Sequence, residues 1–173
     1  MQVRKEQLLS ARLVLKSIEE KDKEDMLKIV VDPLVKKSYM LPDFIGQEEA
    51  DNFFEKVKEL SHKKERFVYG IYSKNKIVGF LNEVTSDKEE IEVGYFIASN
   101  EWNQGYATEA LKLAIEELFR IGYKRVIAGH FESNPASGRV MQKAGMNMID
   151  KAETITYRNI EHRCLFYQIE NKK

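Results

Sequence analysis

The sequence has little cysteine, little proline and no long apolar run. Its 173 residues include one cysteine and three prolines. The single thiol, Cys164, excludes an intramolecular disulfide and any metal site built from several cysteines, and its strand-like surroundings indicate a buried core residue. No stretch approaches the roughly 20 apolar residues that cross a membrane, and no signal-like apolar segment opens the chain. We therefore expect a cytoplasmic protein without a membrane partner.

The chain also lacks an excess of charge of either sign. Its 28 basic residues balance 28 acidic ones, whereas proteins that hold nucleic acid by its phosphates usually carry a basic excess. An apolar fraction of 43% is that of a globular protein. The sequence shows no internal repeat, low-complexity segment or Pro/Gly-rich linker. We expect one domain over residues 1–173 that does not bind nucleic acid.

The hydrophobic pattern predicts a mixed α/β layer fold. Alternation or short apolar runs predict strands at 11–18, 67–72, 77–84, 91–97, 125–131, 148–157 and 164–169. Helical spacing predicts a helix that ends at Asp32–Pro33, a weaker one at 34–40, and further helices at 47–64, 107–121 and 135–144. Short polar links between the second, third and fourth strands indicate an antiparallel meander, and the last two strands a hairpin.

Several residues mark where the later helices begin and end. Gly122 follows the helix at 107–121, in the position where a left-handed glycine often ends a helix. Asn134 precedes the helix at 135–144 as a capping residue, Pro135 occupies its first position, and Gly145 closes it.

The segment between the strand ending at Ile97 and the next helix has the composition of an anion site. The first turn of a helix carries unpaired backbone N–H groups and a positive dipole end, which attract phosphate. Gly105 lets the backbone approach an anion closely, and Ala107 keeps the first turn unobstructed. The pattern predicts that phosphate is held by the amides of Asn103, Gln104, Gly105, Tyr106, Ala107 and Thr108. A GxGxxG fingerprint and a Walker loop are absent.

This segment resembles the pyrophosphate signature of the GNAT superfamily of N-acetyltransferases, Gln/Arg-x-x-Gly-x-Gly/Ala. Trp102–Ala107 matches it, except that tryptophan replaces the leading Gln or Arg. The longer string Trp102–Ala110 is similar to the branch of ribosomal-protein alanine N-acetyltransferases (RimJ/RimL-like). A second match follows about 30 residues later, in Asn134-x-x-Ser137 and Gln142–Met146, which are similar to the Asn-x-x-Ser and Glu-Lys-x-Gly-Phe elements of that branch.

The resemblance implies an acyl-CoA N-acyltransferase fold, with a mostly antiparallel sheet of about seven strands flanked by helices. It implies acetyl-CoA as the co-substrate. The strand before the loop would bend away from its neighbour and offer backbone groups to pantetheine at Phe96, Ile97 and Ala98. Asn134 would bind the pantetheine amides as well as cap its helix. Gly94 either helps this strand to splay or serves packing alone.

Acetyl transfer from a thioester to an amine requires a base and a group that stabilises the departing sulfur. Glu92 is our first candidate for the base, because it lies in an apolar strand two residues before the expected splay. Glu83 is the second; a chain of water molecules, or an exposed Glu92 without a role, stays open. Ser137 matches the serine of the branch and would donate a hydrogen bond to sulfur. Met141 occupies the place of a tyrosine acid found in many members.

The sequence leaves open both the identity of the acetyl acceptor and the class of function. The resemblance implies a protein N-terminal amine, a polyamine or another small amine as acceptor. Rival interpretations are a non-catalytic acyl-CoA-binding or sensing module and a protein-interaction domain. No cluster has metal-ligand spacing, so no metal is expected, and His130 is expected to have a local partner. Trp102 either covers apolar surface beside the co-substrate or anchors the loop. The oligomeric state stays open between monomer and homodimer.

Overall fold

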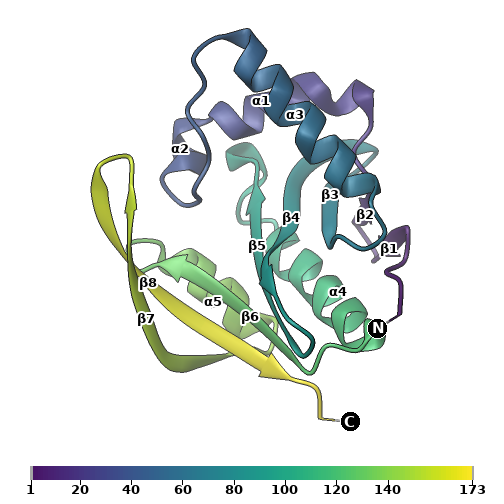
Figure 1. The fold of residues 1–173 in the computed structure, drawn as a ribbon, viewed down its shortest axis with the longest axis vertical. Helices are drawn as coiled ribbons and strands as arrows, with labels where there is room; N and C mark the ends of the chain where they lie inside the picture. Colours follow the sequence, from purple (N-terminus) through teal and green to yellow (C-terminus); the bar gives the residue numbers. More distant parts are fainter. Residues whose placement is uncertain (1, 173) are drawn as a thin grey trace.

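An eight-stranded sheet runs through the whole molecule (Figure 1). The computed structural model describes residues 2–172. The strand order is β1-β2-β3-β4-β5-β6-β8-β7, and neighbours are antiparallel except for β5 and β6. The strands are β1 Gln7–Leu9, β2 Val14–Lys16, β3 Val68–Ser73, β4 Lys76–Ser86, β5 Glu90–Ile97, β6 Arg125–Phe131, β7 Asn147–Tyr157 and β8 Ile160–Glu170. The expected mixed, mostly antiparallel fold is confirmed, with eight strands where about seven were expected.

The additional strand, β1, lies before the strand expected over 11–18, which is present as β2 but is only three residues long. The chain forms a hairpin of β1 and β2 there. Ser10 closes the turn: its N–H donates to the Leu13 carbonyl at 3.0 Å, and its hydroxyl oxygen accepts from the Leu13 N–H at 3.0 Å. A serine that bonds its own backbone in this way favours a turn over a continued strand.

Helices cover the sheet on both faces. The first group is η1 Glu20–Asp22, α1 Lys23–Val31, α2 Pro33–Lys36 and α3 Gln47–His62, and the second is α4 Tyr106–Ile121 and α5 Pro135–Lys143. The weak helix expected at 34–40 is therefore only four residues long. A loop over residues 37–46 follows it and leads to α3. None of the helices within residues 2–172 is long and apolar enough to cross a membrane.

Each face of the sheet has its own hydrophobic core. Helices α4 and α5 pack on one face through buried residues such as Leu111, Leu118 and Met141. Helices α1 and α3 pack on the other face, where Phe54 and Phe96 are buried. Figure 1 shows that α1, α2 and α3 gather over the β2–β5 half, whereas the β6–β8–β7 half carries no helix of this group. The strands β5 and β6 lie at the boundary between the halves.

The helix ends near this boundary match the predictions. Gly122 adopts a left-handed conformation with φ 116° and ends α4, as expected for a glycine without a Cβ. The side chain of Asn134 accepts a hydrogen bond from the Ser137 N–H and caps α5, with Pro135 in the first turn. Gly145, at φ 92°, closes α5.

The C-terminal hairpin is also confirmed and is longer than expected. Arg158 and Asn159 both have positive φ angles, 52° and 60°, and form its tight turn. Next to this turn, the Tyr157 hydroxyl donates to the Leu41 carbonyl at 2.9 Å and accepts from the Leu41 N–H at 3.3 Å. The hairpin is thereby fastened to the 37–46 loop across the open side of the sheet.

Candidate active site

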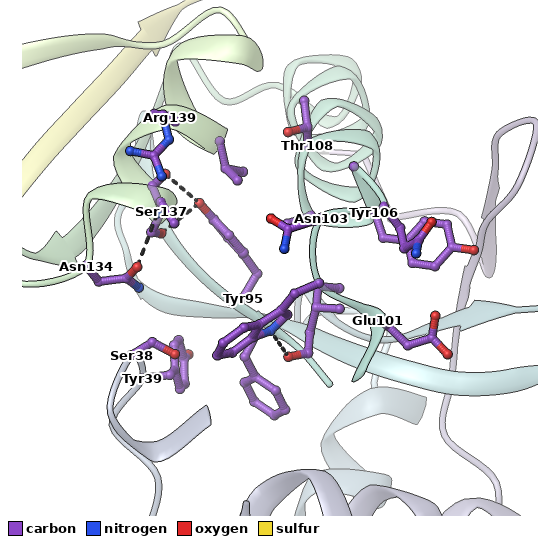
Figure 2. A pocket seen from close by; sticks show the side chains of 18 of the residues that line it. Ser38, Tyr39, Tyr95, Glu101, Asn103, Tyr106, Thr108, Asn134, Ser137 and Arg139 are labelled. Atoms are coloured by element: carbon purple, nitrogen blue, oxygen red, sulfur yellow. Dashed lines mark hydrogen bonds between the residues drawn. The ribbon is translucent and has the colours of Figure 1, made fainter. Parts of the chain in front are cut away.

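A cleft opens where β5 and β6 separate. The two strands pair only over Glu90–Glu92 and Arg125–Ile127. Beyond this point β5 stays with β4, and β6 stays with β8. A cavity of about 560 Å³ occupies the gap (Figure 2). It is lined by Ser38, Tyr39, Tyr95, Phe96, Ile97, Glu101, Trp102, Asn103, Gln104, Gly105, Tyr106, Ala107, Thr108, Gly129, Asn134, Ala136, Ser137, Arg139, Val140 and Lys143.

The backbone of β5 presents polar groups to this cleft, at positions that partly differ from those expected. The Ala98 N–H donates to the Val78 carbonyl at 2.8 Å, so it faces β4 and not the cleft. In an antiparallel ladder the direction alternates, which turns the backbone of Phe96 toward β4 as well. The groups directed to the cleft therefore belong to Tyr95 and Ile97. Of the three expected positions, Phe96 and Ile97 line the cavity and Ala98 does not.

The loop between β5 and α4 turns the start of α4 toward the cavity. Asn103 and Gly105 have positive φ angles of 61° and 79°, and Gly105 is the N-cap of the helix. The Trp102 indole N–H donates to the Ile97 carbonyl at 2.8 Å, yet 39% of the residue is exposed. Trp102 thus anchors the loop to β5 and also lines the cavity. The first turn of α4 supplies backbone N–H groups and the positive end of its dipole there.

Arg12, from the β1–β2 turn, contacts this loop on the side away from the cavity. Arg12 donates to the Gln104 carbonyl at 2.8 Å and to the Glu109 carboxylate at 2.8 Å, and its guanidinium lies over the Tyr106 ring. Burial would raise the pKa of Glu109, but hydrogen bonds from Ser10 and Arg12 outweigh it and lower that pKa. The carboxylate therefore stays charged and holds Arg12 against the loop.

Helix α5 forms the opposite wall of the cavity. Its N-terminal turn contributes Asn134 and Ser137, and its exposed side contributes Arg139 and Lys143, four residues apart and hence on one side of the helix. Neither cation has an ion-pair partner among the residues the structure describes. The cavity therefore combines amide donors on one wall with two uncompensated positive charges on the other, which suits a ligand with several phosphates.

Two hydroxyl groups meet inside the cavity. The Tyr95 hydroxyl of β5 lies 3.1 Å from Ser137 Oγ of α5 and 3.4 Å from the Ser137 carbonyl oxygen. Figure 2 shows the tyrosine reaching across the gap toward the serine. Burial raises the pKa of Tyr95, and the hydrogen bond with Ser137 offsets this only in part. The phenol consequently remains protonated at neutral pH.

The two candidate carboxylates lie in different environments. Glu83 accepts a hydrogen bond from the Phe67 N–H at 2.8 Å and pairs with Arg66 at 2.7 Å. Glu92 is half-buried and has no hydrogen-bond partner within residues 2–172. Burial raises its pKa above the ordinary value, while Lys151 opposes the shift. Glu83 is thus engaged in holding β3 and β4 together, whereas Glu92 is an available carboxylate with increased basicity.

Tyr39 reaches the sheet from the 37–46 loop, on the face where Glu92 lies. Its hydroxyl donates to Asn82 Oδ1 at 2.8 Å, and its ring packs on Phe96 at 5.1 Å between centroids. A Cβ at Gly94 would lie 2.3 Å from this hydroxyl oxygen. The glycine is therefore required by the close approach of Tyr39. This supports the packing alternative for Gly94; the irregularity in the ladder lies nearby, on β4 between Glu83 and Thr85.

Comparisons with known proteins agree with this geometry. Residues 12–147 match the family model described as an acetyltransferase (GNAT) domain. The chain belongs to the GNAT acetyltransferase family. It is therefore an acetyltransferase, and the match covers strands β2 to β6, the cleft and both of its walls, but neither β1 nor the C-terminal hairpin.

Individual relatives are distant but span nearly the whole chain. An uncharacterised N-acetyltransferase of Bacillus subtilis, YoaA, is 24% identical over 153 residues, 86% of each chain. The solved structure of RimL, a ribosomal L7/L12 alpha-N-protein acetyltransferase, has a TM-score of 0.82 at 18% identity, over 96% of this chain and 94% of that one. The microcin C7 self-immunity acetyltransferase MccE, solved with acetyl-CoA and AMP, has a TM-score of 0.81 at 18% identity over 94% of each. The GNAT fold is thus shared, as expected from the sequence.

Against this family background, most of the predicted binding residues come together. The loop from Asn103 to Thr108, Asn134 and Ser137 all line one cavity. Glu92 is not among the lining residues; it lies in the last residue pair before β5 and β6 separate. Met141 is fully buried in the core beneath α5, so that position offers no acid to the cavity. Their roles stay predictions.

Sequence reasoning gave no binding role to several cavity residues, among them Ser38, Tyr39, Tyr95, Arg139 and Lys143. Tyr95 carried a usable signal, because alternation along the predicted strand places it on the face opposite Glu92, Gly94 and Phe96. Ser38 and Tyr39 carried none, since only the tertiary structure brings the 37–46 loop to β5. The expectation that His130 has a local partner is confirmed, because its Nδ1 lies 2.7 Å from the Phe131 carbonyl oxygen.

The environment of Glu92 predicts a pH-dependent stability. Because its pKa is raised on folding, the folded state binds more protons than the unfolded state, and stability falls as pH rises above the ordinary glutamate pKa. Glu92→Gln should therefore raise the melting temperature at pH 7, by about 2 °C or less for a half-buried group. The gain should vanish below about pH 4, where the carboxyl is protonated in both states.

Glu83→Gln is the matched control. It removes the charge that pairs with Arg66 and leaves one acceptor oxygen where the carboxylate offers one each to Arg66 and the Phe67 N–H, so it should lower the melting temperature. Thermal unfolding followed by circular dichroism across pH measures both variants. A lower melting temperature of Glu92→Gln than of the wild type at pH 7 would contradict the assignment of a desolvated carboxylate.

Proposed function

We propose that this protein transfers an acetyl group from acetyl-CoA directly to a primary amine in a ternary complex. The observation that carries the proposal is the cleft between β5 and β6, with the N-terminus of α4 directed into it. A cavity of about 560 Å³ is large enough for an extended ligand arm. Its polar strand edge suits the amides of pantetheine, and its helix N-terminus suits a pyrophosphate.

The residues of the chain would divide the work as follows. Acetyl-CoA supplies an activated acetyl thioester. The loop from Asn103 to Thr108 binds the pyrophosphate, and the strand edge at Tyr95 and Ile97 aligns the pantetheine. Glu92, with its raised pKa, accepts a proton from the amine at the end of the cleft. Ser137 donates a hydrogen bond to the sulfur.

The two cations of α5 support a ligand with a third phosphate group. Coenzyme A carries a 3′-phosphate besides its pyrophosphate, and Arg139 and Lys143 are the cavity residues with positive charge. Since neither is neutralised by a carboxylate within residues 2–172, both remain available for that phosphate. We therefore assign the adenosine end of the ligand to the gap between α4 and α5.

The acceptor is a protein N-terminus or a small amine. The similarity to RimL, which acts on a ribosomal protein, favours a peptide N-terminus. The acceptor side of the cleft is formed by Tyr39, Glu92 and the hairpin that Tyr157 fastens to the 37–46 loop. Tyr39 and Glu92 lie within the family match, whereas this hairpin lies outside it.

Gly105→Glu should abolish acetyl-CoA binding, because a carboxylate would stand against the pyrophosphate. Gly46→Glu is the matched control. Gly46 is also a glycine N-cap with positive φ, 90° against 79° for Gly105, and it also starts a 16-residue helix. Both variants should lose similar stability from backbone strain, about 1–2 kcal/mol. Isothermal titration calorimetry should detect acetyl-CoA binding only to Gly46→Glu and the wild type; unaltered affinity in Gly105→Glu would overturn the loop assignment.

Removing both α5 cations, as Arg139→Gln with Lys143→Gln, should weaken acetyl-CoA binding by about tenfold through the loss of charge-assisted contacts. Binding of the 3′-dephospho form should change little, so the preference for acetyl-CoA should nearly disappear. Lys56→Gln with Lys112→Gln removes the same charge at exposed sites outside the cavity and serves as the control. An equal loss of affinity for both ligands would contradict the 3′-phosphate assignment.

A panel of amines tests the reaction itself. Release of CoA is followed with peptides that begin with alanine or serine, with spermidine and with free amino acids. We expect turnover above background hydrolysis with at least one of them, and the highest kcat/KM with a peptide. Tight acetyl-CoA binding without turnover on any amine would instead support the alternative of a non-catalytic acyl-CoA-binding module.

A further inference from the structure

The hydroxyl groups of Tyr95 and Ser137 form a pair that joins the two walls of the cleft. They lie 3.1 Å apart although 42 residues separate them in the chain. Tyr95 comes from β5 and Ser137 from the first turn of α5, and both line the cavity (Figure 2). The contact spans the two elements that would hold the thioester between them.

The direction of this hydrogen bond follows from chemistry and distance. A phenol is a stronger acid than an aliphatic alcohol and is the better donor. The Tyr95 hydroxyl lies closer to Ser137 Oγ, at 3.1 Å, than to the Ser137 carbonyl, at 3.4 Å, so its hydrogen goes mainly to Oγ. Ser137 Oγ has no other partner among residues 2–172, so its own hydrogen has no acceptor within the protein. It is available to a ligand in the cavity.

We propose that Tyr95 is a positioning residue for Ser137, donating to Oγ so that the serine hydrogen is directed at the sulfur of the thioester. A serine hydroxyl otherwise rotates to suit its surroundings. A hydrogen bond accepted by Ser137 Oγ fixes the rotation of its hydroxyl group. It also polarises the O–H bond, so the hydrogen bond that the serine donates becomes stronger. The inference rests on the proposed function and names the residue that prepares its sulfur-binding donor.

The step that benefits is the departure of the thiolate. The nitrogen of a neutral amine forms a bond to the acetyl carbon, and the C–S bond breaks with its electron pair left on sulfur. The amine proton leaves to the base, and sulfur takes up a proton from solvent after release. The Tyr95–Ser137 chain transfers no proton. It places a hydrogen bond where negative charge develops, which is how donors stabilise such a state.

Tyr167 provides a matched control for deleting a tyrosine hydroxyl. Tyr167 is buried, whereas Tyr95 is partly buried, and the Tyr167 hydroxyl lies against α5 near Gly138 and accepts from Gln142 Nε2 at 3.5 Å. It does not line the cavity. Tyr95→Phe and Tyr167→Phe therefore remove the same atom from two tyrosines whose hydroxyl groups lie against the same helix, and only the first removes the partner of Ser137.

The first measurement needs no acceptor. The ultraviolet absorbance of the thiolate of CoA bound to the protein is titrated with pH. A hydrogen bond to sulfur favours the thiolate, so Tyr95→Phe and Ser137→Ala should each raise the pH of half-ionisation, and the double variant should match Ser137→Ala. Tyr167→Phe should leave it unchanged. No change in Tyr95→Phe, or an equal change in Tyr167→Phe, would overturn the positioning role.

The second measurement is a double-mutant cycle on turnover with the best peptide of the amine panel. Tyr95→Phe should lower kcat about tenfold, as expected for one hydrogen bond, with the KM for acetyl-CoA unchanged. Adding it to Ser137→Ala should cause no further loss, because the tyrosine acts through the serine. Additive losses would refute the proposal while leaving the proposed function intact. Failure of the wild type to bind CoA would refute both.

Discussion

The separation of β5 from β6 is the constraint on which the rest of the site depends. A strand inside a sheet normally satisfies its polar backbone groups on both sides, and leaving them without partners is costly. Here β5 bonds to β4 along its length but to β6 only over Glu90–Glu92. The remaining edge must find other partners. The Trp102 indole provides one for the Ile97 carbonyl, and an amide-bearing ligand is suited to provide the rest.

The same separation explains why the molecule has two halves of different character. Strands β2–β5 carry helices on both faces, with a separate core on each face, whereas β6, β8 and β7 carry helices on one face only. The joint between the halves is therefore a short parallel pairing bordered by helix N-termini. Arg12, the charged Glu109 and Tyr106 hold the N-terminus of α4 in place on the side away from the cavity.

Glu83 and Glu92 show that two residues of one type can have different properties when their surroundings differ. Both lie on neighbouring strands, and both are candidates for a base from sequence. Glu83 is held by a backbone N–H and an arginine, which stabilises its charge and ties it to structure. Glu92 is desolvated without such partners, and its pKa rises. A carboxylate that costs stability in this way, at the end of a cleft, is suited to a reaction more than to the fold.

The sequence by itself determined the local features of this protein. The strand–glycine–helix order around Gly105, the caps at Asn134 and Gly122, and most strands and helices follow from short-range periodicity and backbone chemistry. The strand β1 before the turn at Ser10 escaped this reasoning, because a segment of three residues is too short to show a periodicity. Only the tertiary structure decided the contacts between residues that lie far apart in the sequence. Three hydrogen bonds are examples: Tyr95 with Ser137, 42 residues apart in sequence, and Tyr39 with Asn82, 43 residues apart. The third joins Arg12 to Glu109, which are 97 residues apart. Periodicity specifies which face of an element a side chain occupies, but its partner depends on how the elements pack.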